Sequence, residues 1–333
     1  MTLPDRHSNK RHEEPQGNPP QRLRWPSDPR EIAEPGTGGR DNSRVRFVQP
    51  FGKQYCREAL LLTMHRAAPL LPLPAGEIHL WFCPHGESSD AALEATYRAL
   101  LTPQELQQKD RFHFARDRHR YLMTRVLVRS VLSRYAPIEP NDWRFVNGPF
   151  GRPRIEGPGL EETRGLDFNL SHTAGLIVLA VAREIELGVD VENTLRSAVL
   201  EAVDHYFASA EALSLGTLPA ALQPHRFFEL WTLKESYIKA RGMGLQIPLD
   251  SFAFALDAPG DIGFALADPH DDTAHRWHFR QLQPTPDYMV AVCSSTDARI
   301  VCRETSPLQW ERSLEVPTTR ASRISPLSPI PPS

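Results

Sequence analysis

Cysteine is scarce in this chain, and no long apolar run is present. The four cysteines, Cys56, Cys83, Cys293 and Cys302, are too few and too scattered for a disulfide framework or a zinc site, and they indicate reduced thiols. No apolar stretch reaches the roughly 18 residues that a membrane span needs. The polar, charged N-terminus predicts no secretory signal. We therefore expect a cytoplasmic protein that has no membrane partner.

An excess of positive charge is also missing. The formal net charge is −3 and the isoelectric point is near 6.5. These values argue against a nucleic-acid partner, because nucleic-acid binding usually needs a basic face. Apolar residues make up 40% of the 333 residues, so the chain can bury a hydrophobic core and is long enough for two domains.

The two ends of the chain are poor in large apolar residues. Residues 1–50 are rich in Pro, Arg, Asp, Glu and Gly, and the tail from about Thr305 repeats Ser and Pro. We predict that both are disordered. The leucines of residues 51–76 leave two interpretations open, docking on the core or a plain extension. The predicted boundaries are a mostly disordered N-terminal extension over 1–76 and a disordered tail over 305–333.

Apolar periodicity predicts two halves of similar build, over residues 77–185 and 186–304. Thr102 and Pro103 mark a helix start, with Thr102 as the N-cap. The predicted helices cover residues 90–101, a segment from Thr102, 117–135, 196–215 and 225–241. The predicted strands cover 78–83, 143–146, 166–170, 176–182, a segment from about 186, 251–256, 263–267, 276–281 and 288–294. This order predicts an α+β fold with the ligand site in the cleft between the halves.

Residues 188–192, which read Gly-Val-Asp-Val-Glu, are the most informative segment of the chain. Strand side chains alternate, so Asp190 and Glu192 point to one face and the two valines to the other. Neighbouring like charges repel each other. Such a pair at a strand end therefore indicates a bound cation or a shared proton.

A third carboxylate, Glu235, lies in a helical segment rich in lysine and aromatic residues. Trp231, Glu235 and Lys239 are spaced four apart and share one helix face. Glu235 and Lys239 are compatible with an ordinary surface ion pair. Beside Asp190 and Glu192, they instead indicate Mg²⁺ that serves a phosphate ligand, with Lys239 as a point charge for a phosphate oxygen.

Two further polar segments each have two interpretations. Ser171 and His172 follow a predicted strand, where they can donate to a phosphate or can be a capping serine and a surface histidine. Arg152 lies in the turn Gly-Arg-Pro of residues 151–153 and places one cation there. By itself, neither segment identifies a binding site.

Taken together, these segments resemble the 4′-phosphopantetheinyl transferases, specifically the larger, monomeric, surfactin-synthetase-activating type. The resemblance runs from about Leu101 to Ser294. The segments that carry it are residues 111–112, 126–134, 151–153, 168–173, 188–192, 231–240, 249–252 and 289–293. The combination of Gly-x-Asp-x-Glu with Trp-x-x-Lys-Glu-x-x-x-Lys in one chain is the most specific part.

The resemblance implies a fold of two pseudo-twofold-related α+β halves and a reaction. The enzyme binds coenzyme A and Mg²⁺, and a serine of an apo acyl or peptidyl carrier protein attacks the β-phosphate. Phosphopantetheine moves to that serine, and adenosine 3′,5′-bisphosphate leaves. Relatives of this type are monomers that serve polyketide, nonribosomal-peptide or fatty-acid systems. A basic or apolar docking patch for the carrier is expected along residues 196–225.

The resemblance also implies a role for each residue of the site. The metal ligands are Asp190, Glu192 and Glu235. The catalytic group is Asp190, Glu235 and Lys239, with the general base left open between Glu235 and a water molecule. The implied coenzyme A ligands are Arg152, Ser171, His172, Lys239 and Arg111.

The chain departs from the family pattern at three positions. Glu105 and Gln108 stand where lysines are common, and Arg152 stands where a lysine is common. Cations near the first two positions that would compensate are Lys109, Arg111 and Arg116. The departures at Glu105 and Gln108 keep one alternative open, a non-catalytic relative that binds coenzyme A or carriers. A different Mg²⁺-dependent enzyme that cleaves diphosphates is a second alternative.

Overall fold

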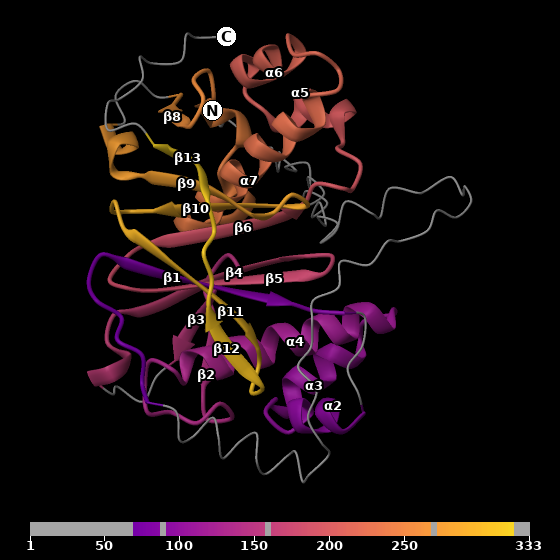
Figure 1. Cartoon of the computed structure of the whole chain (residues 1–333), viewed down its shortest axis with the longest axis vertical. Helices are drawn as coiled ribbons and strands as arrows, with labels where there is room; N and C mark the ends of the chain where they lie inside the picture. The colour runs from indigo at the N-terminus through magenta and orange to yellow at the C-terminus, as the bar shows by residue number, and fades with distance from the viewer. Residues whose placement is uncertain (1–68, 87–90, 157–160, 268–271, 323–333) are drawn as a thin grey trace, which may run out of the picture. The chain divides into compact units, whose positions relative to one another are not determined.

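A computed structural model describes residues 69–86, 91–156, 161–267 and 272–322 (Figure 1). The described helices and strands form an α+β fold with two main sheets and one short hairpin. This architecture confirms the predicted fold class of two α+β halves. The chain passes from the first sheet to the second between β5 and β6, near residue 185.

The first sheet has five strands in the order β12-β11-β1-β5-β4. Their bounds are Glu77–Pro84 for β1, Leu166–Thr173 for β4, Leu176–Arg183 for β5, Arg299–Ser306 for β11 and Trp310–Ser313 for β12. The helices of this half are α2 (Ala91–Arg98), α3 (Pro103–Asp110), α4 (Ala115–Leu132) and the 3₁₀ helix η2 (Glu161–Thr163). Buried apolar residues of α4, among them Val126 and Leu127, share one core cluster with Trp81 and Leu179 of the sheet. A separate hairpin is formed by β2 (Arg144–Asn147) and β3 (Pro153–Glu156).

The second sheet has six strands in the order β6-β10-β9-β13-β8-β7. Their bounds are Leu187–Asn193 for β6, Phe252–Ala255 for β7, Asp261–Leu266 for β8, His278–Thr285 for β9, Tyr288–Ser294 for β10 and Thr318–Ser322 for β13. The long helix α7 (Gln223–Arg241) packs on β6 and β10 (Figure 1). The shorter helices are η3 (Leu200–Ala202), α5 (Val203–Tyr206), α6 (Ser209–Gly216), η4 (Gly244–Gln246), η5 (Leu249–Ser251) and η6 (Asp272–Arg276).

The two sheets share an apolar core on the faces turned away from α4 and α7. Ile78 and Leu80 of β1 belong to the same buried cluster as Val189 and Val191 of β6. The valines therefore face the first sheet, as the alternation of the sequence predicted. The opposite face of β6 carries Asp190 and Glu192 toward α7.

The capping residue Thr102 correctly predicted where α3 begins, whereas apolar periodicity predicted α5 and α6 less well. Thr102 caps α3, since its Oγ1 accepts from the backbone N–H of Glu105 (3.2 Å) and the Glu105 carboxylate accepts from the N–H of Thr102 (2.9 Å). The predicted helix over 196–215 is wrong in its extent. Residues 200–216 instead form η3, which runs directly into α5, and then α6 after residues 207–208.

The predicted disordered tail is wrong for residues 305–322. β11 belongs to the first sheet through parallel pairing with β1, so residues 299–304 were wrongly assigned to the second half. β12 extends the first sheet, and β13 inserts between β9 and β8 of the second sheet. Backbone pairing with existing strands stabilises this segment despite its Ser and Pro content. Residues 323–333 lie outside the described part.

The N-terminal extension is described only from Pro69 onward. The N–H of Leu71 donates to the carbonyl of Arg134 (2.6 Å), and Leu73 is buried in the core of the first half. Residues 69–76 therefore dock on the fold, which answers the open question for that part. The rest of the predicted extension, residues 1–68, lies outside the described residues.

The described residues can be compared with two expectations from composition, reduced cysteines and the lack of a membrane-spanning segment. Cys83, Cys293 and Cys302 are free thiols, and Cys56 lies outside the described residues. Among the helices of the described segments, none combines the length and apolar character that a membrane span requires.

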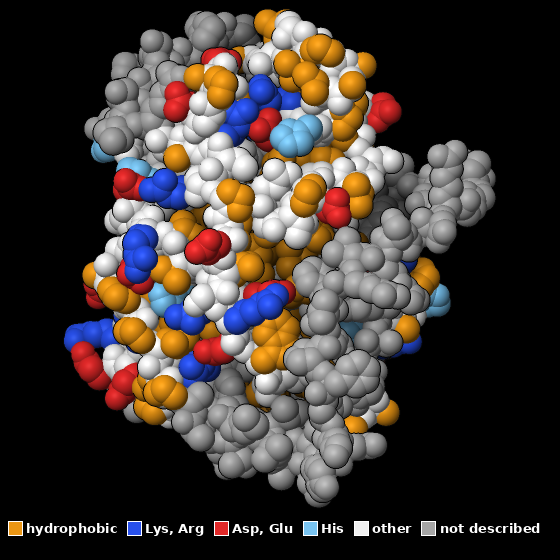
Figure 2. All heavy atoms as spheres, in the orientation of Figure 1, with side chains coloured by type: hydrophobic (Ala, Val, Ile, Leu, Met, Phe, Trp, Pro, Cys, Tyr) orange, Lys and Arg blue, Asp and Glu red, His pale blue; other side chains and the backbone are white. Residues whose placement is uncertain are grey.

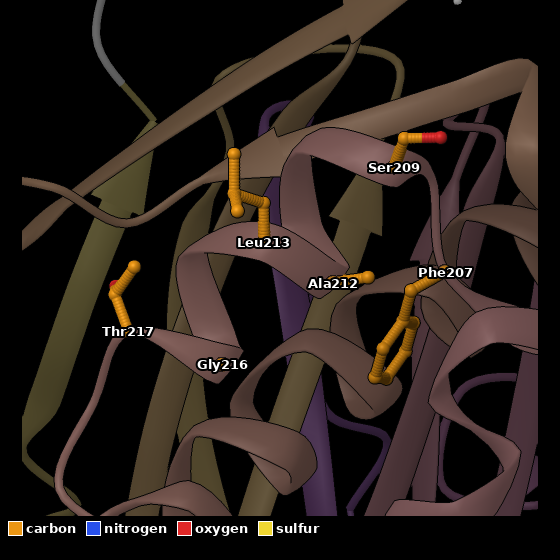
Figure 3. A pocket seen from close by; sticks show the side chains of 6 residues that line it. All are labelled: Phe207, Ser209, Ala212, Leu213, Gly216 and Thr217. Carbon is orange, nitrogen blue, oxygen red and sulfur yellow. The ribbon is translucent and has the colours of Figure 1, made fainter.

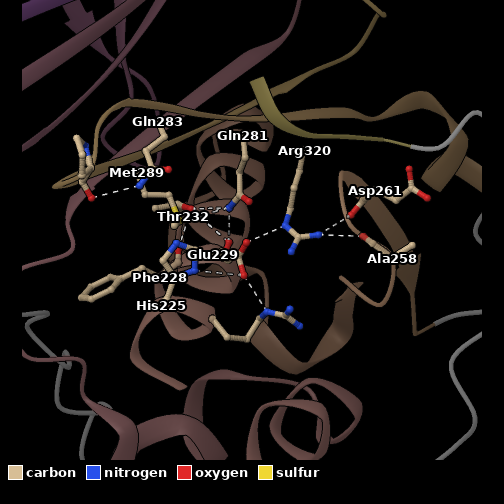
Figure 4. Close-up of polar contacts among 12 residues, drawn as sticks. His225, Phe228, Glu229, Thr232, Ala258, Asp261, Gln281, Gln283, Met289 and Arg320 are labelled. Carbon is tan, nitrogen blue, oxygen red and sulfur yellow. Dashed lines mark hydrogen bonds and ion pairs between the residues drawn. The ribbon is translucent and has the colours of Figure 1, made fainter. Parts of the chain in front are cut away.

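An ion-pair cluster ties β13 to α7 (Figure 4). The Arg320 guanidinium donates to Glu229 Oε1 (2.7 Å) and to the carbonyls of Ala258 and Asp261, and Arg226 donates to Glu229 Oε2 (2.8 Å). Burial alone would raise the pKa of Glu229. The bonds from His225, Arg320 and Arg226 outweigh burial and lower this pKa to about 2. Residues of the predicted tail thereby become part of the core of the second half.

Replacing Arg320 by alanine should destabilise the protein by about 3 kcal/mol, because it leaves one buried oxygen of Glu229 unpaired. The depressed pKa of Glu229 contributes stability above its ordinary value of 4.5, and this contribution is lost as the pH falls toward 2. The difference between wild type and Arg320→Ala, measured by urea unfolding, should therefore be full at about pH 7 and reduced by about half at about pH 3. Arg164→Ala breaks only an exposed pair with Glu161 and should cost less than about 1 kcal/mol. An equal effect of both variants would contradict this account.

Candidate active site

Side chains of β4 join the two sheets at their facing edges. β4 is the last strand of the first sheet and β6 the first strand of the second. Three alternate residues of β4, which share one face, bond to β6. Asn169 Oδ1 accepts from the N–H of Val189 (2.9 Å), Ser171 Oγ donates to Asp190 (2.8 Å), and Thr173 Oγ1 accepts from the N–H of Asn193 (3.3 Å). These bonds place the predicted Ser171 and Asp190 in direct contact.

Lys239 of α7 completes a three-way contact at this edge. Its Nζ donates to Asp190 Oδ1 (2.7 Å) and to Ser171 Oγ (2.9 Å). Asp190 is buried, whereas the Lys239 side chain is 27% exposed. The other oxygen, Asp190 Oδ2, is buried and has no hydrogen-bond partner among the described residues. The structure thus brings together three predicted residues from three elements.

Glu192 and Glu235 lie near Asp190. Glu192 is buried and accepts from Trp231 Nε1 (3.1 Å) and from Arg196 (3.0 Å). Burial and the charge of Asp190 raise the pKa of Glu192, and the same two causes, in the same order, raise the pKa of Glu235. The three carboxylates are therefore close enough to repel one another, and a cation bound among them would relieve that repulsion.

The carboxylates suit a hard cation in their chemistry, although their present arrangement is not that of a ligand set. Within the described ranges, no group of three or more His, Cys, Asp or Glu side chains is placed to hold a metal ion. The Lys239 ammonium occupies one oxygen of Asp190. The unpartnered Asp190 Oδ2 and the raised pKa values of Glu192 and Glu235 fit Mg²⁺, which prefers oxygen ligands. The predicted metal role of these three residues stays a prediction.

Arg152 lies in the turn between β2 and β3 and reaches the end of α7. Its NH1 donates to the carbonyls of Lys239 (2.7 Å) and Ala240 (3.1 Å), and its NH2 donates to Asp167 (2.8 Å). The side chain is 10% exposed. Most of its donors are therefore used within the protein, and its predicted role as a coenzyme A ligand stays a prediction.

His172 is exposed at the same end of β4. Desolvation by the surrounding protein, together with the charges of Arg120 and Lys239, lowers the pKa of His172 below its ordinary value. The imidazole is therefore neutral near pH 7 and can donate one hydrogen bond without adding charge. Arg120 of α4, which the sequence did not single out, is the nearby cation on the first half.

Arg111 and the residues around it are not joined to this cluster. Arg111 follows α3, is exposed and donates to Gln108 (3.3 Å). No hydrogen bond or ion pair in the described structure links it to the other predicted site residues. Lys109 pairs with Asp110, and Arg116 lies over the ring of Phe114. The binding role of Arg111 stays a prediction.

Glu105 has a structural role that explains its departure from the family pattern. Besides capping α3, its carboxylate pairs with the fully buried Arg129 (2.8 Å). Arg129 in turn donates to the carbonyls of Pro140 and Trp143. A lysine at position 105 would leave Arg129 without its carboxylate partner.

Lys234, the other lysine of the Trp-x-x-Lys-Glu-x-x-x-Lys segment, points away from the site. Its side chain and that of Glu211 are fully buried, and they pair at 2.8 Å. Lys234 also donates to the carbonyls of Leu249 and Phe252. The pair fixes α7 to α6 and β7, so this lysine orients the helix that carries Glu235.

Several residues that complete the site carry no short sequence signal. Asn169, Asp167 and Arg196 lie in ordinary strand and turn segments, and their partners are distant in sequence or on another element. Trp231 was grouped with Glu235 and Lys239 by spacing alone, and the structure adds its hydrogen bond to Glu192.

A cavity along α6 is lined by none of the predicted site residues (Figure 3). Its volume is about 590 Å³, and it is lined by Phe207, Ser209, Ala212, Leu213, Gly216 and Thr217. Leu213 is 72% exposed and Leu222 is 55% exposed. Figure 2 shows apolar side chains gathered over α5 and α6. Both leucines lie in the range where an apolar patch was predicted.

Comparisons with known proteins identify two matching family profiles. The profile "4′-phosphopantetheinyl transferase, N-terminal" matches residues 87–184, and the profile "4′-phosphopantetheinyl transferase superfamily" matches residues 186–293. The profiles meet where the chain passes between the sheets.

Curated relatives match over most of their length. The 4′-phosphopantetheinyl transferase Sfp of Bacillus subtilis is 32% identical over 60% of this chain and 84% of its own. The 4′-phosphopantetheinyl transferase HetI of Nostoc is 33% identical over 67% of this chain and 90% of its own. A phosphopantetheinyl transferase of Thraustochytrium is 27% identical over 66% of this chain and 80% of its own.

Gly188→Ala should separate α7 from the strand that carries Asp190. A Cβ at this position would lie 2.0 Å from the carbonyl oxygen of Ser236 and 2.3 Å from the backbone nitrogen of Ala240. Since backbone atoms cannot yield locally, we expect a loss of about 3 kcal/mol, measured by urea unfolding. Gly216→Ala meets no atom within 4 Å and should be neutral or stabilising by up to about 1 kcal/mol. An unchanged unfolding midpoint for Gly188→Ala would contradict this account of how α7 packs on β6.

Proposed function

The chain belongs to the 4′-phosphopantetheinyl transferase family, and we propose that it transfers the phosphopantetheine of coenzyme A to a serine of an apo acyl or peptidyl carrier protein. The second product is adenosine 3′,5′-bisphosphate, and the reaction requires Mg²⁺. The observation that carries this proposal is the convergence of Ser171, Asp190 and Lys239 from β4, β6 and α7. Burial and the charge of Asp190 raise the pKa of both Glu192 and Glu235.

The three carboxylates form the acidic part of the site. Asp190, Glu192 and Glu235 would hold Mg²⁺, which supplies positive charge to a diphosphate while its bridging bond breaks. Trp231 and Arg196 fix one oxygen of Glu192 through hydrogen bonds. Asp190 Oδ2, which has no partner in the described residues, is free to ligate. These contacts orient the carboxylates before the substrate binds.

The basic part of the site neutralises the phosphates of coenzyme A. The Lys239 side chain, which is partly exposed, supplies a positive charge, and the His172 imidazole supplies a hydrogen bond. The Ser171 hydroxyl can donate to a phosphate once it turns away from Asp190, to which it donates in this structure. In the transfer step, the serine hydroxyl of the carrier gives its proton to Glu235 or to a water molecule. Its oxygen bonds to the β-phosphorus, and the bond from that phosphorus to the bridging oxygen breaks. The bridging oxygen leaves on adenosine 3′,5′-bisphosphate, so cations near the leaving phosphate lower the barrier.

The apolar surface over α5 and α6 suits the docking of the carrier. Leu213 is exposed on α6 and Leu222 is exposed directly before α7, and Leu213 lines the cavity along α6 (Figure 3). The buried Lys234–Glu211 pair connects α6 to α7, so a carrier docked on α6 is held beside the helix that bears Glu235 and Lys239.

Incubation with coenzyme A, Mg²⁺ and an apo carrier should add about 340 Da to the carrier, the mass of one phosphopantetheine group. Intact-mass spectrometry over a panel of acyl and peptidyl carriers measures this gain. Coenzyme A binding by calorimetry without any gain across the panel would support the non-catalytic alternative. Release of adenosine 3′,5′-bisphosphate in the absence of a carrier would support the diphosphate-cleaving alternative.

Asp190→Asn should lower the transfer rate by at least about 100-fold, since it removes a charged oxygen from the site. It should also abolish the rise in melting temperature that Mg²⁺ with coenzyme A gives the wild type. The control Asp257→Asn makes the same change at an exposed position of the loop after β7 and should leave both readouts unaltered. Full activity of Asp190→Asn with Mg²⁺ would exclude Asp190 as a metal ligand.

A further inference from the structure

Arg152 links β4 to α7, the two elements that the contact between Ser171 and Lys239 also links. On the α7 side it binds backbone carbonyls instead of a side chain. Its NH1 binds the carbonyl of Lys239 itself (2.7 Å) and that of Ala240 (3.1 Å), at the C-terminal end of α7. Its NH2 binds Asp167 of β4 (2.8 Å), and Asp167 is held in turn by the N–H of Phe168 (2.8 Å). Lys239 is thus fixed at both ends, its ammonium by Asp190 and its carbonyl by Arg152.

Three physical properties suit this arrangement. A cation at a helix C-terminus is stabilised by the partial negative charge of the last carbonyls. The planar guanidinium can bind two carbonyls and a carboxylate at once, which the single ammonium of a lysine does less well. The Arg152 side chain is 10% exposed and that of Asp167 is 35% exposed, so the arginine itself is largely shielded from competing water.

Gly242 shows that the approach of Arg152 is built into the end of α7. Its φ of 63° is left-handed, a conformation that favours glycine and ends the helix. A Cβ at this position would lie 3.3 Å from Arg152 Cδ, tighter than an ordinary contact. The glycine therefore serves both the helix end and the space that the arginine side chain occupies.

We propose that Arg152 is a positioning residue, a clamp that sets Lys239 and the last turn of α7 against β4. It is not primarily a ligand of the coenzyme A phosphates. This inference rests on the proposed function, because it assigns the role of Arg152 within that same site. The clamp acts on the rate of transfer through the placement of Lys239, and it leaves the affinity for coenzyme A largely unchanged.

The two roles predict opposite effects for a change at Asp167. If Arg152 held a phosphate, removal of the nearby carboxylate charge would free the guanidinium and strengthen coenzyme A binding. If Arg152 is a clamp, removal of the same charge weakens the clamp and slows transfer. Asp167→Asn therefore separates the roles with little change in volume.

The experiment measures kcat, the KM for coenzyme A and the coenzyme A Kd for four variants of the full chain. We expect Arg152→Ala, Arg152→Lys and Asp167→Asn to lower kcat about 10- to 100-fold, the loss typical of a displaced catalytic group. The KM and Kd should change less than about threefold. Arg154→Ala removes an exposed arginine two residues further on, in strand β3, and should match the wild type in kcat, KM and Kd.

The proposal is overturned if Arg152→Ala weakens coenzyme A binding at least tenfold, Arg152→Lys restores it and Asp167→Asn strengthens it. It is also overturned if the three variants behave like Arg154→Ala. Should Arg152→Ala fail to fold, Arg152→Lys and Asp167→Asn still decide between the roles.

Hydrogen exchange tests the clamp independently of any activity. The N–H of Gly242 donates to the carbonyls of Ile238 and Lys239, so it reports the order of the last turn of α7. It should exchange faster in Asp167→Asn and Arg152→Lys than in the wild type and Arg154→Ala, and equal rates in all four would overturn the clamp. A wild type that exchanges as expected but modifies no carrier would instead refute the proposed function.

Discussion

The contact of Lys239 with Asp190 and Ser171 is the interaction on which the site depends. Each partner comes from a different element, and two of the three residues are buried. An ion pair at the edge of two sheets loses water, so it is stable only if its geometry is held from outside. Much of the surrounding structure does this, through the β4 side chains that bond to β6 and through the close approach of α7 to Gly188.

Helix α7 is the part of the molecule that must be placed with the least freedom. It carries Glu235 and Lys239 to the site on one face. On other faces it is fixed by Lys234 to α6 and β7, and by Glu229 to β13. Arg152 holds its C-terminal carbonyls. The charged groups of α7 outside the site are therefore used to orient the helix, and their burial makes these bonds strong and specific.

The C-terminal segment shows how an extension becomes part of a fold. β11 and β12 continue the first sheet and β13 completes the second, so this segment contributes to both halves. Arg320 then reaches α7 through Glu229. Composition predicted disorder here, because Ser and Pro are common and large apolar residues are few. The segment is ordered by pairing with strands already present, a contribution that local composition does not contain.

The sequence by itself determined the fold class, the alternation that separates Val189 from Asp190, and the helix face shared by Trp231, Glu235 and Lys239. These follow from short periodicities, which local geometry dictates. Only the tertiary structure decided that Arg152 binds the end of α7, that Glu105 pairs with Arg129 and that β13 lies between β9 and β8. The side-chain contacts join residues between 24 and 88 positions apart, and β13 pairs with strands that precede it in the chain. No periodicity encodes such partners, because they are selected by the packing of whole elements.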